Sequence, residues 1–454
     1  MSRPEEDRST TVRYRADAVV PCDGSRRVLR PGFVEVVDGV IARVGPPGNV
    51  GGSDEREPVE EIEVRGALLP GLVNTHCHSP MTLFRGTGEN LPLGSWLQDV
   101  LWPREANLTP EDVYWGMTLA LAELLRFGVT TTSEAYFFED AIADAVLAAG
   151  ARAIVTPGIL QLPGCEGGAS WWDARIAEIV DFHRRRHGEG GRLEVGFAPH
   201  AAYTVPLEVL IEAAREARAL DAILHLHLAE TEDEGKSFEA EHGGSVPVVL
   251  GREGVLEGRV LAAHCVWLSA EDMAVLQHHD VGVAHCPQSN AKLASGIAPL
   301  VDLLARGIRV GLGTDGPASN NDLDLWEEMR LAAMLARLRE CDAGAIDSAT
   351  VLELATRGAG QALGRPDLGV LAPGARADMI AVCLDDPAFV PLLDDELLIE
   401  HLVWSASSRL VTDVWVEGRQ VVEAGRCLTV DLEEARTEVE QRARRLQASV
   451  GSDR

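Results

Sequence analysis

Positive charge is scarce in this chain of 454 residues. Lysine and arginine together number 41 against 71 aspartates and glutamates, a formal net charge of −30 at pH 7, and the only lysines are Lys236 and Lys292. Phosphate backbones and anionic membranes attract proteins through clusters of lysine and arginine. The charge balance therefore argues against nucleic acid and membranes as partners and leaves small molecules as substrates.

Long apolar runs are missing as well. No run approaches the length of a membrane helix, and residues 1–8 lack the apolar core of a secretion signal. The eight cysteines form no C-x-x-C pair, so reduced thiols are the natural interpretation. We expect a cytoplasmic protein. With 46% hydrophobic residues, the chain can bury a large core.

Two histidines close the apolar run 67–75, in the order His76-Cys77-His78. Residues i and i+2 of a strand share a face, so both imidazoles project the same way. Such a pair can hold a divalent transition metal if further ligands join it. Alone it is weak evidence, because an H-x-H spacing often arises by chance.

Further polar residues stand at the carboxyl ends of later apolar runs. His227 ends the run 222–228, and Glu230 comes three residues after it. His264 ends the next such run, and Asp315 follows a third. Carboxylate oxygens often complete a nitrogen-rich metal site. The same placement on several predicted strands indicates one shared site and is hard to explain by core packing.

The apolar runs alternate with helical patterns along most of the chain. Alternation predicts parallel strands joined by crossover helices, and eight such units predict an α/β fold with a closed (β/α)8 TIM-type barrel over residues 68–365. Active sites of these barrels lie at the carboxyl ends of the strands, where the polar residues fall. The predicted strands are 68–75, 128–134, 152–159, 193–199, 222–228, 259–265, 281–286 and 309–314.

Both ends of the chain have a different pattern, with short strands and frequent turns. Asp38-Gly39 marks a hairpin before the barrel, and similar short strands return after it, for example at 411–422. We predict one small β-sandwich domain built from residues 1–67 and 366–430. Residues 431–454 are expected to form a charged helix and a fraying tail.

Together these motifs resemble the amidohydrolase superfamily, in its branch of cytosine, guanine and adenosine-type deaminases and triazine hydrolases. Within that branch, residues 81–86 and 91–97 most resemble methylthioadenosine/S-adenosylhomocysteine deaminases. The match covers nearly the whole chain. The signatures are Pro70-Gly71-Leu72-Val73-Asn74-Thr75-His76-Cys77-His78, His227-Leu228-Ala229-Glu230, Ala263-His264-Cys265 and Gly313-Thr314-Asp315-Gly316-Pro317-Ala318-Ser319-Asn320-Asn321.

The resemblance implies a metal-dependent deaminase that acts on an adenine-type nucleoside. Its implied metal ligands are His76, His78, His227 and Asp315. Asp315 and His264 would take the proton of the attacking water, and Glu230 would protonate a ring nitrogen. That last role requires an environment that raises the pKa of Glu230.

The implied metal count is one. Binuclear members of the superfamily use a carboxylated lysine on the fourth barrel strand, and the predicted fourth strand here, 193–199, has no lysine. Zinc is the default ion for histidine and carboxylate ligands, and iron or manganese stay open.

Substrate contacts are also carried over by resemblance. Glu89 would accept hydrogen bonds from the ribose hydroxyls, although a solvated loop carboxylate is the alternative. His200 would meet the base or sugar. Two further residues are suggested by their positions in the sequence: Trp96 would cover the base, with ordinary helix packing as the alternative, and His285, at the end of the predicted seventh strand, would line the pocket.

Two positions in the sequence bear on which 5' substituent the substrate carries. Relatives that accept the tail of S-adenosylhomocysteine place arginines where this chain has Pro157 and Ala169. Their absence favours adenosine, 5'-methylthioadenosine or 5'-deoxyadenosine-like substrates, unless Arg175 compensates.

Two other functions compete with this one. A related hydrolase acting on a free base, a triazine or another C–N or C–Cl bond would use the same hydroxide. A metal-stabilised scaffold has no use for both Glu230 and His264. Family habit also implies a homo-oligomer.

Overall fold

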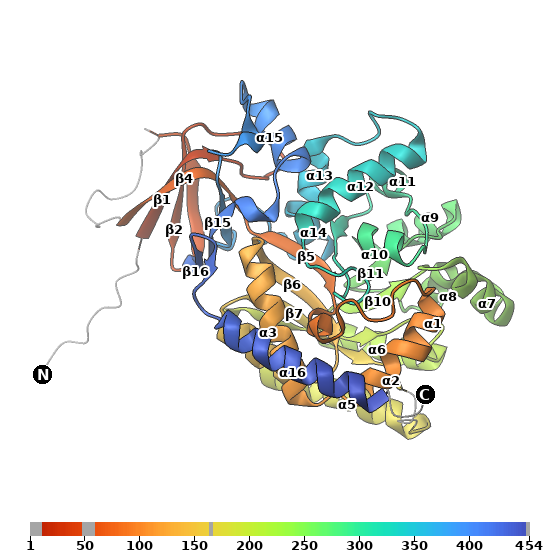
Figure 1. The fold of residues 1–454 in the computed structure, drawn as a ribbon. Helices are drawn as coiled ribbons and strands as arrows, with labels where there is room; N and C mark the ends of the chain where they lie inside the picture. The colour runs from red at the N-terminus through yellow and green to blue at the C-terminus, as the bar shows by residue number, and fades with distance from the viewer. Residues whose placement is uncertain (1–10, 48–59, 163–166, 451–454) are drawn as a thin grey trace, which may run out of the picture.

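The computed structural model describes residues 11–47, 60–162 and 167–450, which form a barrel and an adjoining β-sheet (Figure 1). Within these ranges no helix has the length and apolar character needed to cross a membrane. The expected combination of a (β/α)8 barrel with a small β domain is confirmed.

The barrel consists of parallel strands that pair in the order of the sequence. One run leads from β5 to β8, and another from β10 to β13. A parallel bridge from Phe197 to Leu224 joins the two runs, and the Thr75 hydroxyl donates to the Leu312 carbonyl across the seam between β13 and β5. The strands are β5 Leu72–Cys77, β6 Val129–Tyr136, β7 Arg152–Ile159, β8 Leu193–Val195 with β9 Ala198–Pro199, β10 Leu224–Leu228, β11 Val260–His264, β12 Gly282–His285 and β13 Val310–Leu312.

Both chain ends share one eight-stranded sheet. Its order is β17-β16-β15-β14-β4-β1-β2-β3, and the antiparallel pair β14–β4 joins the C-terminal strands to the N-terminal ones. Its own apolar core includes Tyr14 and Trp415, whose rings meet edge to face. The strands are β1 Thr11–Val19, β2 Gly32–Val37, β3 Val40–Gly45, β4 Glu60–Pro70, β14 Met379–Val382, β15 Val411–Val416, β16 Arg419–Glu423 and β17 Arg426–Cys427.

The strand expected at 68–75 is divided between the two sheets. Residues up to Pro70 belong to β4, and the barrel begins at Leu72. Gly71 separates them, and a Cβ there would lie 2.1 Å from the Thr130 hydroxyl, so the chain crosses at a residue without a side chain. The expected boundary at 67 and 68 therefore falls inside β4, and the domain limits remain a proposal.

Helices cover the outside of the barrel (Figure 1). The first long helix, α3, begins with a capping box in which Thr109 and Asp112 exchange hydrogen bonds with the backbone. The main helices are α3 Pro110–Arg126, α4 Glu139–Ala149, α5 Ala169–Arg186, α6 Leu207–Ala219, α7 Glu232–His242, α8 Val246–Arg252, α9 Ala270–His278, α10 Pro287–Lys292, α11 Leu300–Ala305, α12 Leu325–Glu340, α13 Ser348–Leu354, α14 Arg357–Ala362, α15 Asp395–Trp404 and α16 Leu432–Val450.

One helical segment, residues 93–105, forms a wall of the barrel mouth. It consists of α1 Leu93–Ser95, a π-helical stretch Trp96–Leu101 and α2 Trp102–Glu105. The Trp102 N–H bonds to the Leu97 carbonyl, five residues back. Pro103 has no N–H and its ring would clash with the carbonyl four residues back, which accounts for the wider turn.

Candidate metal centre

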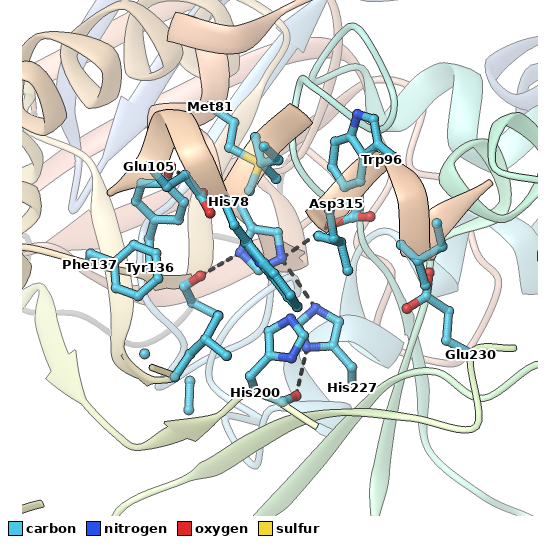
Figure 2. A pocket seen from close by; sticks show the side chains of 18 of the residues that line it. His78, Met81, Trp96, Glu105, Tyr136, Phe137, His200, His227, Glu230 and Asp315 are labelled. Atoms are coloured by element: carbon cyan, nitrogen blue, oxygen red, sulfur yellow. Dashed lines mark hydrogen bonds and ion pairs between the residues drawn. The ribbon is translucent and has the colours of Figure 1, made fainter. Parts of the chain in front are cut away.

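Four buried side chains converge at the carboxyl ends of β5, β10, β11 and β13. Ligand atoms of His76, His227, His264 and Asp315 all lie within 4.8 Å of one another. His78 adjoins them, with its Nε2 3.3 Å from Asp315 Oδ1 and 3.3 Å from His227 Nε2 (Figure 2). The structure thus brings the predicted ligands together, and it adds His264 to the same cluster.

The far sides of three of these imidazoles are fixed by hydrogen-bond acceptors. His227 Nδ1 donates to the His200 carbonyl at 2.8 Å, and His78 Nδ1 donates to the Ala135 carbonyl. His264 Nδ1 lies 2.9 Å from Asn290 Oδ1. Because a carbonyl oxygen only accepts, Nδ1 carries the hydrogen and the Nε2 lone pair points into the cluster.

The donor set fits a divalent cation. His76 Nε2 is buried, 3.3 Å from Asp315 Oδ1, and has no aligned hydrogen-bond partner among the described residues. Burial lowers the pKa of His76 to about 4, so this imidazole is neutral and its lone pair is available. An unpaired polar atom in a dry interior costs free energy, and a bound ion would satisfy it.

Asp315 uses its two oxygens differently. Oδ2 accepts from the hydroxyls of Ser289 at 2.6 Å and Ser319 at 2.8 Å, whereas Oδ1 faces the imidazoles. Burial would raise the pKa of Asp315, but the neighbouring His76 and His78 hold it well below its usual range. The result is a carboxylate with one oxygen anchored and the other open to a cation or a proton.

Backbone strain gathers at these strand ends. Ala229, His264, Cys265 and Asp315 all have φ between 50° and 72°. Such left-handed conformations are costly for residues with side chains and persist where the surroundings enforce them. Here they turn the chain sharply, so that Glu230, His264 and Asp315 reach the same space.

Glu230 lies beside this cluster as a potential proton donor. Burial raises the pKa of Glu230, and its Oε2 is 3.9 Å from His264 Nε2. Its own N–H donates to Glu234 Oε2 at 2.9 Å, so α7 holds the turn in place. The raised pKa is in the direction that protonation at neutral pH requires.

A largely apolar cavity opens over the cluster, with about 730 Å³ of empty space, part of it open to solvent. Trp96 lines it and donates its indole N–H to the Thr87 carbonyl. His200 lines it too, with Nδ1 2.8 Å from the Thr204 hydroxyl. Figure 2 shows Glu105 and Tyr136 on one side of the cluster and Glu230 on the other. The cavity is therefore polar at both ends and at its floor.

Residues 67–421 match the amidohydrolase family. The chain belongs to this family. It is 43% identical over 435 residues to the 5-methylthioadenosine/S-adenosylhomocysteine deaminase of Desulforudis audaxviator, which covers 95% of this chain and 98% of the relative. It is 39% identical to the 5'-deoxyadenosine deaminase of Methanosarcina mazei, covering 96% and 98%. An adenosine deaminase from Xanthomonas campestris, solved with bound zinc, has a TM-score of 0.89 at 36% identity, covering 97% and 99%.

In this amidohydrolase the structure does not bring Glu89 to the cavity. Its carboxylate accepts from Lys292 Nζ at 3.0 Å and from Asn321 Nδ2 at 3.2 Å, and it is not one of the residues that line the cavity. The ammonium group of Lys292 holds it at the surface. The carboxylate that does line the cavity is Glu105, which is buried and accepts from the Tyr136 hydroxyl at 2.7 Å.

His285 also differs from its prediction. It is buried at the end of β12, enclosed by its neighbours, and does not line the cavity. His225, one layer deeper in the barrel than His227, does line the cavity. Its Nε2 lies 2.8 Å from His76 Nδ1. His225 therefore orients a predicted ligand.

Sequence reasoning also missed the two serines on Asp315. Ser319 lies four residues after Asp315 in the motif 313–321. This spacing would bring the two side chains together if the segment formed a helical turn, so the sequence did offer a signal for Ser319. Ser289 comes from α10, and no local pattern connects it to Asp315.

Proposed function

We propose that this amidohydrolase is a metal-dependent hydrolytic deaminase that converts an adenine-type nucleoside to its inosine analogue and ammonia. One observation carries the proposal. A single cavity combines a buried group of metal-binding side chains, the proton donor Glu230 on one side and the carboxylate of Glu105 on the other. The names of its relatives support the same reaction.

The ligand set we propose is His76, His78, His227 and Asp315, with His264 outside it. Burial alone would lower the pKa of His264, but Glu230 and Asp315 outweigh that effect and raise it. An imidazole that gains a proton cannot ligate, so His264 is better suited to accept a proton than to bind metal. When bound, a divalent ion makes a water molecule nucleophilic near neutral pH.

We propose one zinc ion at this site. Both lysines are engaged elsewhere, Lys236 with Glu232 and Lys292 with Glu89, so neither is placed to bridge a second ion. Histidine nitrogen and carboxylate oxygen suit zinc, and the zinc-bound adenosine deaminase structure supports this choice.

The residues divide the proton transfers between them. Glu230 donates a proton to the ring nitrogen next to the carbon that bears the amine. Water then adds to that carbon, and Asp315 and His264 take the water's proton. They deliver it to the exocyclic nitrogen, the C–N bond breaks while the new hydroxyl returns a proton to Glu230, and ammonia leaves together with an inosine-type product.

The two ends of the cavity match a nucleoside. In an adenine nucleoside, the ring nitrogen beside the amine and the ribose lie at opposite ends of the purine. Glu230 and Glu105 likewise lie on opposite sides of the metal-binding cluster (Figure 2). A vicinal diol offers two donors to the Glu105 carboxylate, whereas a free base offers none there.

Ammonia release tests this proposal directly. We expect zinc-loaded protein to release ammonia from adenosine, 5'-methylthioadenosine and 5'-deoxyadenosine, with a kcat/KM at least about tenfold above that for cytosine, guanine or triazines. Turnover confined to free bases or triazines would instead support a related hydrolase and remove the ribose contact.

A further inference from the structure

Two hollows adjoin the reaction cavity, and they differ from it in charge. The first, called the 5' hollow here, is lined by Glu105, Phe137, Glu139, Gly158, Trp171 and Arg175 among others, with about 1130 Å³ of empty space open to solvent. Glu105, Phe137 and Gly158 line the reaction cavity too, so the two spaces are continuous.

Arg175 is the only basic side chain among the described residues that line the 5' hollow. Its Nη1 and Nη2 donate to the two oxygens of Glu139 at 2.9 and 3.0 Å. Nη1 also lies 3.3 Å from Glu178, and Nε donates to the Gly158 carbonyl at 3.1 Å. The guanidinium is largely buried, four of its five N–H groups have an acceptor, and its charge is offset by two carboxylates.

The second hollow offers no cation either. Its described lining includes Glu232, Asp233 and Glu234 and contains no lysine or arginine. Both of these hollows are therefore lined by more carboxylates than basic side chains.

The position of Glu105 decides which hollow a 5' group enters. Glu105 lines the reaction cavity and the 5' hollow but not the second hollow. If its carboxylate holds the ribose diol, the ribose lies where the reaction cavity meets the 5' hollow, and the 5' carbon attached to that ring is within reach of the 5' hollow. This step rests on the proposed function.

We propose that the Glu139–Arg175 pair makes this enzyme selective for nucleosides with an uncharged 5' substituent. A carboxylate or phosphate in the 5' hollow meets Glu139 and Glu178, and the only cation there, Arg175, is already paired with these two carboxylates, so the anion loses hydration with little compensation. Hydrogen, hydroxyl and methylthio groups carry no such penalty and pack against Phe137, Leu160 and Trp171. The substrate class is thus narrower than that of a deaminase that also accepts S-adenosylhomocysteine.

A matched pair of ligands tests the proposal on the unaltered enzyme. Adenosine-5'-carboxylate and adenosine-5'-carboxamide have nearly the same shape and differ in charge. We expect the carboxamide to inhibit 5'-methylthioadenosine turnover with a Ki at least about tenfold lower than the carboxylate. Equal Ki values, or tighter binding of the carboxylate, overturn the proposal.

Releasing Arg175 should reverse the preference. In Glu139→Gln, the arginine loses its bidentate partner, and we expect the kcat/KM ratio of S-adenosylhomocysteine to 5'-methylthioadenosine to rise at least about tenfold through a lower KM. The double variant Glu139→Gln with Arg175→Leu should lose that gain. Asp181→Asn, which removes an exposed partner of Arg185 on the same helix, should leave the ratio unchanged.

The outcomes distinguish a failure of the proposed 5' selectivity from a failure of the proposed deaminase activity. A wild-type enzyme that deaminates 5'-methylthioadenosine but shows no change of ratio in a folded Glu139→Gln protein refutes the selectivity and leaves the deaminase intact. Absence of turnover with any nucleoside refutes the deaminase, and the selectivity falls with it.

Discussion

Single atoms decide the chemistry at the residue scale. His78 and His227 each donate Nδ1–H to a backbone carbonyl, which aims their Nε2 lone pairs inward. Asp315 anchors one oxygen on two serines and leaves the other free. Such supporting hydrogen bonds fix tautomer and orientation before any ligand arrives, which lowers the cost of assembling a metal site.

Glu230→Gln tests the proton donor. Glutamine preserves the shape of the side chain but cannot deliver a proton, so kcat should fall by roughly two to four orders of magnitude. The zinc content of the purified variant should equal that of the wild type, because Glu230 is not a proposed ligand. Full activity with metal retained would remove Glu230 from the reaction.

Glu105 gives a pH dependence that can be predicted in sign. Burial raises its pKa to about 7, against the opposing effect of the Tyr136 hydroxyl. Below that pH the carboxyl group is protonated, and its O–H oxygen is then a poorer hydrogen-bond acceptor for the ribose diol. Above it both oxygens accept, so the KM for adenosine should fall as pH rises through about 7.

Glu105→Gln provides the control for that profile. The amide does not titrate, so the KM of this variant should be high and flat between pH 6 and about 8. A KM that still falls with rising pH in Glu105→Gln would assign the titration to another group.

At the scale of elements, the C-terminal helix supports the wall of the active site. α16 lies along α3 and also contacts α2, which carries Glu105 (Figure 1). Arg442 pairs with Glu111 at 2.7 Å, and Arg445 pairs with the buried Asp112. The helix runs from Leu432 to Val450 and buries Ala435, Val439 and Leu446.

Leu446 is the residue of α16 that best tests this support. It is fully buried, so Leu446→Ala should cost about 2–5 kcal/mol of unfolding free energy through lost burial and a cavity. Leu428→Ala is the matched control, because Leu428 is 53% exposed and should change stability by less than about 1 kcal/mol. Urea denaturation of both variants measures the difference, and equal midpoints would mean that α16 is not packed as described.

The same scale explains why Glu105 escaped prediction from the sequence. Glu89 and Glu105 both lie between β5 and α3, in a segment without strong periodicity. Which of them faces the cavity depends on the π-helical turn before Pro103 and on the Lys292 contact with Glu89. Neither the π-helical turn nor the Lys292 contact can be predicted from the local propensities of residues 89–105. The metal-binding residues were easier to predict, because each follows a recognisable apolar strand.

At the scale of the whole molecule, a buried ion pair joins the barrel to the sheet of the chain ends. Arg152 of β7 donates to both oxygens of Asp378 at 2.8 and 3.2 Å, and both side chains are almost fully buried. The Asp378 carbonyl accepts from Gly71 N–H, at the point where the chain passes from β4 to β5. The two parts are therefore tied together near their covalent junction.

Removing one partner should destabilise the whole protein. Arg152→Met leaves Asp378 buried without its cation, and we expect a loss of about 3–5 kcal/mol in unfolding free energy. Arg185→Met removes an exposed surface pair with Asp140 and should leave the denaturation midpoint unchanged. Equal behaviour of the two variants would contradict the structural role of the junction.

The architecture was largely predictable because each barrel strand has its own apolar run followed by a helical pattern. The boundary was not, since Leu68 and Leu69 read as barrel strand yet pair with β14 in the other sheet. Which sheet a strand joins, and in which register, depends on pairing with strands far away in the sequence, and an apolar run does not encode that pairing. Ser289 and Glu105 were missed for the same reason.

The most direct test follows one turnover in oxygen-18-labelled water. Zinc-loaded enzyme is given 5'-methylthioadenosine, and ammonia and the product mass are measured together. The account predicts one ammonia per product molecule and one labelled oxygen on the carbon that lost the amine. Ammonia without the label, or an unchanged nucleoside with metal bound, would contradict it.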